Sequence, residues 1–187
     1  MRKLWLSLIL AALFGPLQAL AQSHLGYDYR NLKKGTVFVY ERSSGEEFEL
    51  RFVGKRQNLY VFEAHSINGN NKIYDRTIYR NVKGQTVRME RSDGATIKYE
   101  PHNCFLVVGQ CDHVVFDRNG NPGKYRANGK LTNRGYTQTT EYLNGSKFEP
   151  FMKVRMKFDK DGREVTRQIQ QGGKKSQIDL KKVIIPN

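Results

Sequence analysis

The feature that most constrains this chain is a series of tight-turn dipeptides that end in glycine. Asparagine or aspartate precedes most of these glycines, and such pairs accept the positive φ that a tight hairpin requires. The pairs are Asn68-Gly69, Lys83-Gly84, Asp93-Gly94, Asn119-Gly120, Asn128-Gly129, Asn144-Gly145, Asp161-Gly162 and Gly172-Gly173. Short segments between turns of this kind are typical of antiparallel β structure.

The segments between the turns alternate apolar and polar residues. Phe48, Leu50 and Phe52 alternate with charged residues, and the same pattern recurs over 95–100 and 147–158. Alternation of apolar and polar residues with a period of two is typical of β-strands that have one buried and one solvent-exposed face. The predicted strands span 36–42, 47–54, 58–65, 71–80, 85–91, 95–100, 103–108, 112–117, 123–127, 135–143, 147–158, 163–170 and 176–184. Residues 23–33 are predicted to form a short helix, with Ser23 as its cap.

These strands predict an all-β fold. Consecutive strands joined by tight turns form an antiparallel meander, here of about 10–13 strands, and each strand twists relative to the last. We therefore expect a curved sheet, a half-barrel or an up-and-down barrel, with a β-sandwich as the alternative. An outer-membrane barrel is disfavoured, because charges interrupt both faces of several strands.

The N-terminus has the features of a secretory signal. It reads MRKLWLSLILAALFGPLQALAQ, with Arg2 and Lys3 before an apolar run and Ala19-Leu20-Ala21 before Gln22. The continuous apolar run is shorter than the ~20 residues of a membrane span. We expect residues 1–21 to be cleaved and 22–187 to form one periplasmic or secreted all-β domain, and no other segment predicts a transmembrane span.

Cys104 and Cys111 are the only cysteines. In an oxidising compartment such a pair is expected to form a disulfide, which stabilises a loop of this length by roughly 2.5 kcal/mol. If the disulfide has a purely structural role, Cys104→Ser should lower stability and leave ligand binding largely intact. His102 and His113 flank the pair and suggest a metal site as an alternative, but the spacing matches no zinc pattern. A redox-active pair is the other alternative, and it lacks the Cys-x-x-Cys spacing.

The chain is strongly basic. Its 32 lysines and arginines against 18 acidic residues give a formal net charge of +14, which becomes +12 without Arg2 and Lys3. Such a protein attracts polyanions. For an exported chain we expect a lipid or another anionic component of the cell envelope as partner rather than nucleic acid. The sequence does not indicate an oligomeric state.

Catalytic motifs are absent from the sequence. The four histidines are scattered, and no Gly-x-Ser-x-Gly elbow occurs. Glu46, Glu47 and Glu49 form the densest acidic cluster, which we interpret as a solvated strand face. We therefore expect no enzyme activity, no cofactor and no metal.

The candidate binding residues lie on the longest predicted strand. Lys153, Arg155 and Lys157 share one face, and Met152 and Met156 share the other. The basic row would suit an anionic surface, and the methionines would suit an acyl chain. The leading hypothesis is an exported carrier for a lipid or another amphiphilic anionic ligand. The alternative is a non-catalytic structural or interaction module that contacts another envelope component.

Overall fold

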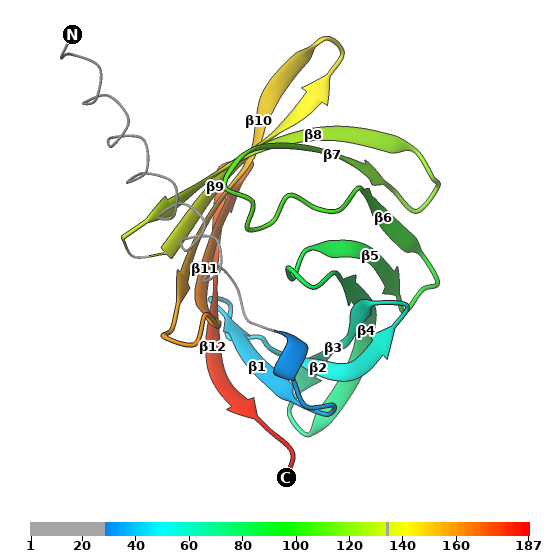
Figure 1. Cartoon of the computed structure of the whole chain (residues 1–187), viewed down its shortest axis with the longest axis vertical. Coiled ribbons are helices and arrows are strands. Elements are labelled where there is room, and N and C mark those ends of the chain that lie inside the picture. The colour runs from blue at the N-terminus through cyan, green and yellow to red at the C-terminus, as the bar shows by residue number, and fades with distance from the viewer. Residues whose placement is uncertain (1–28, 134) are drawn as a thin grey trace, which may run out of the picture.

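The protein is a closed β-barrel in a computed structural model that describes residues 29–133 and 135–187 (Figure 1). Twelve antiparallel strands follow one another around the ring in chain order. The expected all-β meander is therefore confirmed, in its up-and-down barrel form. The predicted signal peptide and residues 23–28 of the predicted helix lie outside the described residues.

A 3₁₀ turn, η1 (Tyr29–Asn31), precedes the barrel, and the other regular elements among the described residues are strands. The strands are β1 (Val37–Arg42), β2 (Glu47–Arg56), β3 (Leu59–Asn68), β4 (Asn71–Arg80), β5 (Thr86–Arg91), β6 (Thr96–Glu100), β7 (Gly109–Phe116), β8 (Pro122–Thr132), β9 (Gly135–Asn144), β10 (Lys147–Phe158), β11 (Glu164–Gln171) and β12 (Lys174–Ile184). No helix among the described residues is long and apolar enough to cross a membrane.

Pairing of the first strand with the last closes the ring. Val37 of β1 lies opposite Ile184 of β12, and Val39 lies opposite Lys182. On its other side β1 pairs with β2 over Val37–Glu41. Closure leaves no strand of the sheet with an unpaired edge.

Most of the predicted turns are confirmed. Gly69, Gly94 and Gly145 each connect two strands with φ values between 58° and 81°. Asn128-Gly129 is the exception, and its prediction as a turn was wrong. Both residues lie inside β8, where Gly129 pairs with Gln138 of β9.

The predicted strand at 103–108 was also wrong. The chain leaves the sheet after Glu100 and returns at Gly109, and residues 101–108 form a loop that we call the plug loop. It crosses the inside of the ring between β6 and β7 (Figure 1). Phe105 and Leu106 of this loop are partly buried, and pattern alone does not distinguish such an apolar run from a buried strand.

The barrel interior holds two clusters of buried side chains. The first is formed by Phe38, Phe52, Tyr60, Phe62, Ala64 and Ile78, from β1 to β4. The second is formed by Tyr136, Val154 and Met156, from β9 and β10, and the plug loop packs on it through Phe105 and Leu106. The space between the two clusters is the candidate site.

Candidate functional site

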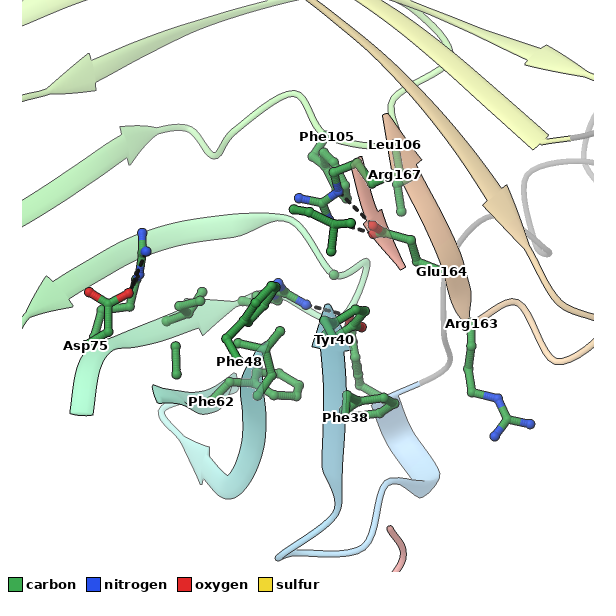
Figure 2. Close-up of a pocket in the computed structure, with 18 of the residues that line it drawn as sticks. Phe38, Tyr40, Phe48, Phe62, Asp75, Phe105, Leu106, Arg163, Glu164 and Arg167 are labelled. Carbon is green, nitrogen blue, oxygen red and sulfur yellow. Dashed lines mark hydrogen bonds and ion pairs between the residues drawn. The ribbon is translucent and has the colours of Figure 1, made fainter. Parts of the chain in front are cut away.

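A cavity of about 280 Å³ lies inside the barrel (Figure 2). One side is the wall formed by β1 to β4, and the other is formed by the plug loop and β10 to β12. Its volume is close to the lower end of the range typical of small-molecule sites, ~300–1,000 Å³. The cavity is therefore large enough to be considered as a binding site.

The β1–β4 wall is mainly apolar because alternate residues of each strand face inward. The inward residues that line the cavity include Phe38, Tyr40, Phe48, Leu50, Phe62, Ala64 and Ile78. Phe105 and Leu106 of the plug loop lie on the opposite side (Figure 2). An apolar chain placed between them would be enclosed by aromatic and aliphatic side chains.

Charged side chains also line the cavity, and most of them are basic. The basic residues are Arg42, Arg76, Arg80, Lys83, Arg163 and Arg167, and the acidic residues are Asp75 and Glu164. The formal excess is 6 − 2, or four positive charges. An anionic group would therefore be attracted to this space.

Four of the five lining arginines have a carboxylate partner. The pairs are Arg42–Glu46 at 2.8 Å, Arg76–Asp75 at 2.6 Å, Arg163–Asp159 at 3.0 Å and Arg167–Glu164 at 2.6 Å. The guanidinium of Arg167 is held by two hydrogen bonds to Glu164 and lies 4.7 Å from the ring centroid of Phe105. Desolvation lowers the pKa of Arg167, but the Glu164 carboxylate, together with Tyr40 and Tyr29, outweighs this effect and the pKa is raised overall.

Arg80 differs from the other four. Its Nη1 donates a hydrogen bond of 2.8 Å to the hydroxyl of Tyr29, and its guanidinium carbon lies 5.1 Å from the ring centroid of Phe62. Its Nε is buried and has no hydrogen-bond partner, and no carboxylate among the described residues pairs with it. This cation is thus oriented by aromatic residues and left without a counter-charge.

Tyr40 is a further polar group on the wall. Burial raises the pKa of its hydroxyl far above the ordinary value, and the negative charge of Glu164 raises it further. The hydroxyl therefore stays protonated under all physiological conditions. It offers the cavity a neutral hydrogen-bonding group rather than an additional charge.

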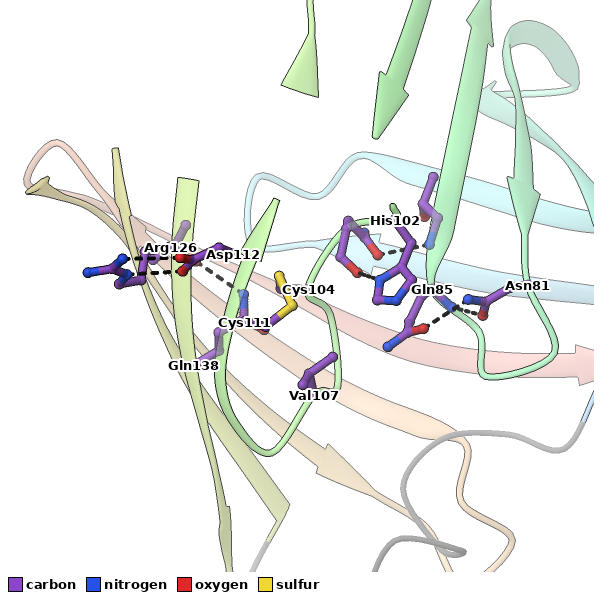
Figure 3. The surroundings of a disulfide bond; sticks show 12 residues. Asn81, Gln85, His102, Cys104, Val107, Cys111, Asp112, Arg126 and Gln138 are labelled. Carbon is purple, nitrogen blue, oxygen red and sulfur yellow. Dashed lines mark hydrogen bonds and ion pairs between the residues drawn. A yellow bond between two sulfur atoms is a disulfide. The ribbon is translucent and has the colours of Figure 1, made fainter. Parts of the chain in front are cut away.

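The plug loop is fastened at three points. The disulfide between Cys104 and Cys111 joins it to β7 (Figure 3). Asn103 pairs with Thr86 of β5 through its backbone N–H and its side-chain oxygen, each at 2.8 Å. The Tyr136 hydroxyl donates a 2.7 Å hydrogen bond to the carbonyl of Val107, and burial raises the pKa of Tyr136 to about 12.

The cysteine pair is a disulfide in the structure, as expected from the sequence. His102 hydrogen-bonds through Nδ1 with the carbonyl oxygen of Asn103. In the part of the chain that the structure describes, no three His, Cys, Asp or Glu side chains are grouped as metal ligands. The sulfurs are bonded to each other, and the pKa of His113 is lowered by burial and by the charge of nearby His102.

None of the five binding residues proposed from the sequence lines the cavity. Lys153, Arg155 and Lys157 are exposed on the outer face of β10. Met156 is 2% exposed and belongs to the second core cluster, against which Met152 packs. The alternation along β10 was read correctly, but the cavity lies on the far side of this core.

One member of the acidic cluster, Glu49, differs from the expectation of a solvated face, whereas Glu46 is exposed and Glu47 is half-buried. Glu49 is 2% exposed, on the face of β2 opposite to the cavity-lining Leu50. Lys72 donates a 2.7 Å hydrogen bond to it, and Arg51 lies 3.5 Å away. Lys72 from β4 and Arg51 from β2 itself thus cover a carboxylate that was expected to lie in solvent.

The arginines of the cavity were missed because basic residues were read as solvent-facing. A signal was present in the alternation. Arg80 shares its parity with Ile78 on β4, and Arg167 shares its parity with Ile169 on β11. An arginine that alternates in step with the apolar residues of its strand lies on the inward face. Two such arginines indicate that the interior of the barrel is lined with charge.

Comparison with known proteins gives three solved structures of similar overall arrangement. The hypothetical lipoprotein YmcC of Escherichia coli K12 shares 6% identity, with a TM-score of 0.47 over 92% of this chain and 96% of that one. A putative exported protein of Bacteroides fragilis with a YmcC-like fold shares 9%, with a TM-score of 0.38 over 82% and 97%. A β-barrel-like protein of unknown function from Brucella abortus shares 10%, with a TM-score of 0.43 over 81% and 98%.

At these identities and TM-scores the likenesses carry no functional argument. No protein-family model and no curated protein matches the sequence. The function is therefore argued from the cavity itself.

Proposed function

We propose that this chain is an exported binding or carrier protein that holds an amphiphilic anionic molecule, such as a lipid, inside its barrel. The observation that carries the proposal is the combination of an apolar wall and an excess of cations around one interior cavity. An apolar tail packed against Phe48, Leu50 and Phe62 would be removed from water, and an anionic head group could pair with an arginine.

The proposal assigns binding and no reaction to the cavity. Its charged groups are chiefly arginines, which stay protonated at all physiological pH values and cannot act as general bases. Export rests on the N-terminal signal features, and we propose the periplasm or the extracellular medium as the location. N-terminal sequencing of protein recovered from those fractions should begin at Gln22.

Native mass spectrometry and ligand uptake test the proposal. Protein purified from the envelope should carry a bound small molecule, and the delipidated protein should take up a fluorescent fatty acid. Leu50→Trp fills part of the cavity and should reduce uptake at least tenfold. Leu131→Trp is the matched control, because Leu131 is 41% exposed and lies outside the cavity lining.

The proposal fails if the native protein carries nothing and the delipidated protein takes up no fatty acid. It also fails if the two tryptophan variants lose uptake equally, because the ligand would then be held elsewhere. Thermal unfolding of both variants separates a filled cavity from a damaged fold.

A second candidate function is an interaction module that uses its outer face. Lys153, Arg155 and Lys157 are exposed on β10, and successive members of this row are spaced by ~6.6–6.8 Å. The residues beside them on β9 and β11 are uncharged: Thr139, Thr137, Gln170, Gln168 and Thr166. The row is thus a stripe of positive charge that could lie along an anionic envelope surface.

Cosedimentation with vesicles containing phosphatidylglycerol tests this second function. Replacing all three basic residues by glutamate should abolish cosedimentation and leave the melting temperature unchanged, since the side chains are exposed. Unchanged cosedimentation would contradict a role of these three residues in binding an anionic surface. The carrier function is independent of this result, because the stripe does not line the cavity.

A further inference from the structure

We propose that Arg80 is the head-group residue of the cavity, and that the ligand is a single-chain amphiphile with one anionic head, a carboxylate or a phosphate. The inference rests on the proposed function and goes one step further. It names which cation binds the head, where the tail lies and how many chains the ligand has.

The first step is the difference among the lining arginines. Arg42, Arg76, Arg163 and Arg167 each have a carboxylate within 3.0 Å. Their charge is already neutralised, so an incoming anion would compete with a fixed carboxylate. Only Arg80 among the five lacks such a partner within the described residues.

The second step is the orientation of Arg80. The Tyr29 hydroxyl accepts a hydrogen bond from Nη1, and the Phe62 ring lies along the guanidinium. These contacts hold the planar group in place but leave Nε buried and without a hydrogen-bond partner. A desolvated guanidinium without a counter-charge is costly, and an anion that reached it from the cavity would supply that counter-charge. Guanidinium groups bind carboxylate and phosphate in a two-pronged geometry, which explains an arginine here rather than a lysine.

The third step is the position of the tail. Arg80 is the last residue of β4, and on neighbouring β3 Tyr60 lies opposite it. From that level the cavity lining continues along β3 through Phe62 and Ala64 to Ser66. The six residue-to-residue steps from Tyr60 to Ser66 span about 20 Å. A chain with its head at Arg80 would therefore extend along β3 towards the turn between β3 and β4.

The size of the cavity limits the ligand to one chain. Its volume of about 280 Å³ is close to the smallest typical for small-molecule sites. The plug loop occupies another part of the interior with Phe105 and Leu106, which pack on the second core cluster. A two-chain phospholipid would have to displace this loop, whereas a single chain would not.

Four ligands with the same tail test the head-group assignment. Dodecanoate, dodecyl phosphate, dodecanol and dodecyltrimethylammonium compete for the neutral fluorophore N-phenyl-1-naphthylamine bound to the delipidated full-length mature protein. The wild type should bind both anions at least tenfold more tightly than dodecanol, and the cation most weakly. The ratio between the two anions distinguishes a carboxylate ligand from a phosphate ligand.

Arg80→Gln is the decisive variant. It should weaken both anions at least tenfold and change the affinity for dodecanol less than twofold. Arg80→Lys keeps the charge and loses the two-pronged geometry. Its affinity for the anions should therefore lie between that of the wild type and that of Arg80→Gln. Arg155→Gln on the outer face removes the same charge and should change no affinity.

The outcomes separate this inference from the proposed function. A wild type that binds none of the four ligands overturns both. A wild type that binds dodecanol and dodecanoate equally overturns the head-group assignment alone, as does an Arg80→Gln protein that keeps its affinity for the anions. An equal loss of dodecanol and dodecanoate binding in a folded Arg80→Gln protein would show that Arg80 only shapes the cavity, and would also overturn the assignment.

Discussion

Gly129 lies where the plug loop touches the barrel wall. A Cβ atom at this position would lie 2.0 Å from the carbonyl oxygen of Val107 and 2.1 Å from the hydroxyl of Tyr136. These two groups form the hydrogen bond that fastens the loop. The glycine is thus required by close packing, although its sequence context, Asn-Gly, resembles that of a turn.

Gly129→Ala should therefore destabilise the protein by about 3 kcal/mol. The methyl group must displace the loop, which costs about 1–3 kcal/mol as overpacking, and it breaks the Tyr136–Val107 hydrogen bond, worth about 1 kcal/mol. Chemical denaturation measures the free energy of unfolding.

Gly123→Ala is the matched control on the same strand. There the nearest atom to the new methyl group would be a ring carbon of Tyr125 at 3.1 Å, and that side chain can shift. We expect a loss below about 1 kcal/mol for the control. Equal losses for the two variants would contradict the role assigned to Gly129.

At the scale of elements, the plug loop is the part that the strand pattern does not describe. The disulfide attaches it to β7, and Phe105 and Leu106 extend from it towards the cavity. The disulfide therefore does more than staple neighbouring strands. It holds two lining residues of the cavity in position.

Replacing both cysteines by serine should lower stability and weaken ligand binding together. By the chain-entropy estimate for this loop length, the loss of stability should be roughly 2.5 kcal/mol. Freed from β7, the loop should show faster hydrogen exchange at 101–108, and fatty-acid affinity should fall several-fold. The expectation from the sequence that ligand binding would be kept is replaced, because Phe105 and Leu106 line the cavity.

Leu106→Ala in the intact disulfide protein is the comparison for that variant. It removes one lining side chain and leaves the loop fastened. If the double serine variant binds fatty acid as tightly as the wild type while unfolding more easily, the loop has a purely structural role.

The sequence predicts the hairpins well and the cavity poorly, and the reason is physical. Turn glycines and alternation are local signals, so the strands and the closed meander could be anticipated from them. The burial of the Arg80 guanidinium and the position of Phe105 in the cavity lining depend on which strands face each other across the barrel. The run Phe105–Val108 satisfies a strand pattern as well as a plug, and only the surrounding barrel distinguishes the two.

At the scale of the whole molecule, the barrel depends on one long-range pairing. Every other strand pair joins neighbours in sequence, whereas β1 pairs with β12 across the length of the domain. The cavity wall includes Phe38 and Tyr40 of β1 and Ile178 of β12. Closing the barrel therefore also completes the site.

Removing residues 181–187 should unpair the first half of β1 from β12 and leave only Tyr40, Glu41 and Arg42 paired with it. Val37, Phe38 and Val39 would lose their partners Ile184, Val183 and Lys182. At about 1 kcal/mol for each lost backbone hydrogen bond, we expect a loss of about 3 kcal/mol, with additional loss from the exposure of Phe38. The unpaired edge of β1 would also favour association between molecules, so sedimentation velocity should detect oligomers at concentrations where the full-length protein shows none.

Removing only 185–187, beyond the end of β12, is the control and should leave both the stability and the sedimentation unchanged. Fast hydrogen exchange confined to β1 would support loss of this one pairing, whereas unchanged exchange in β1 would show that the barrel does not depend on it for closure.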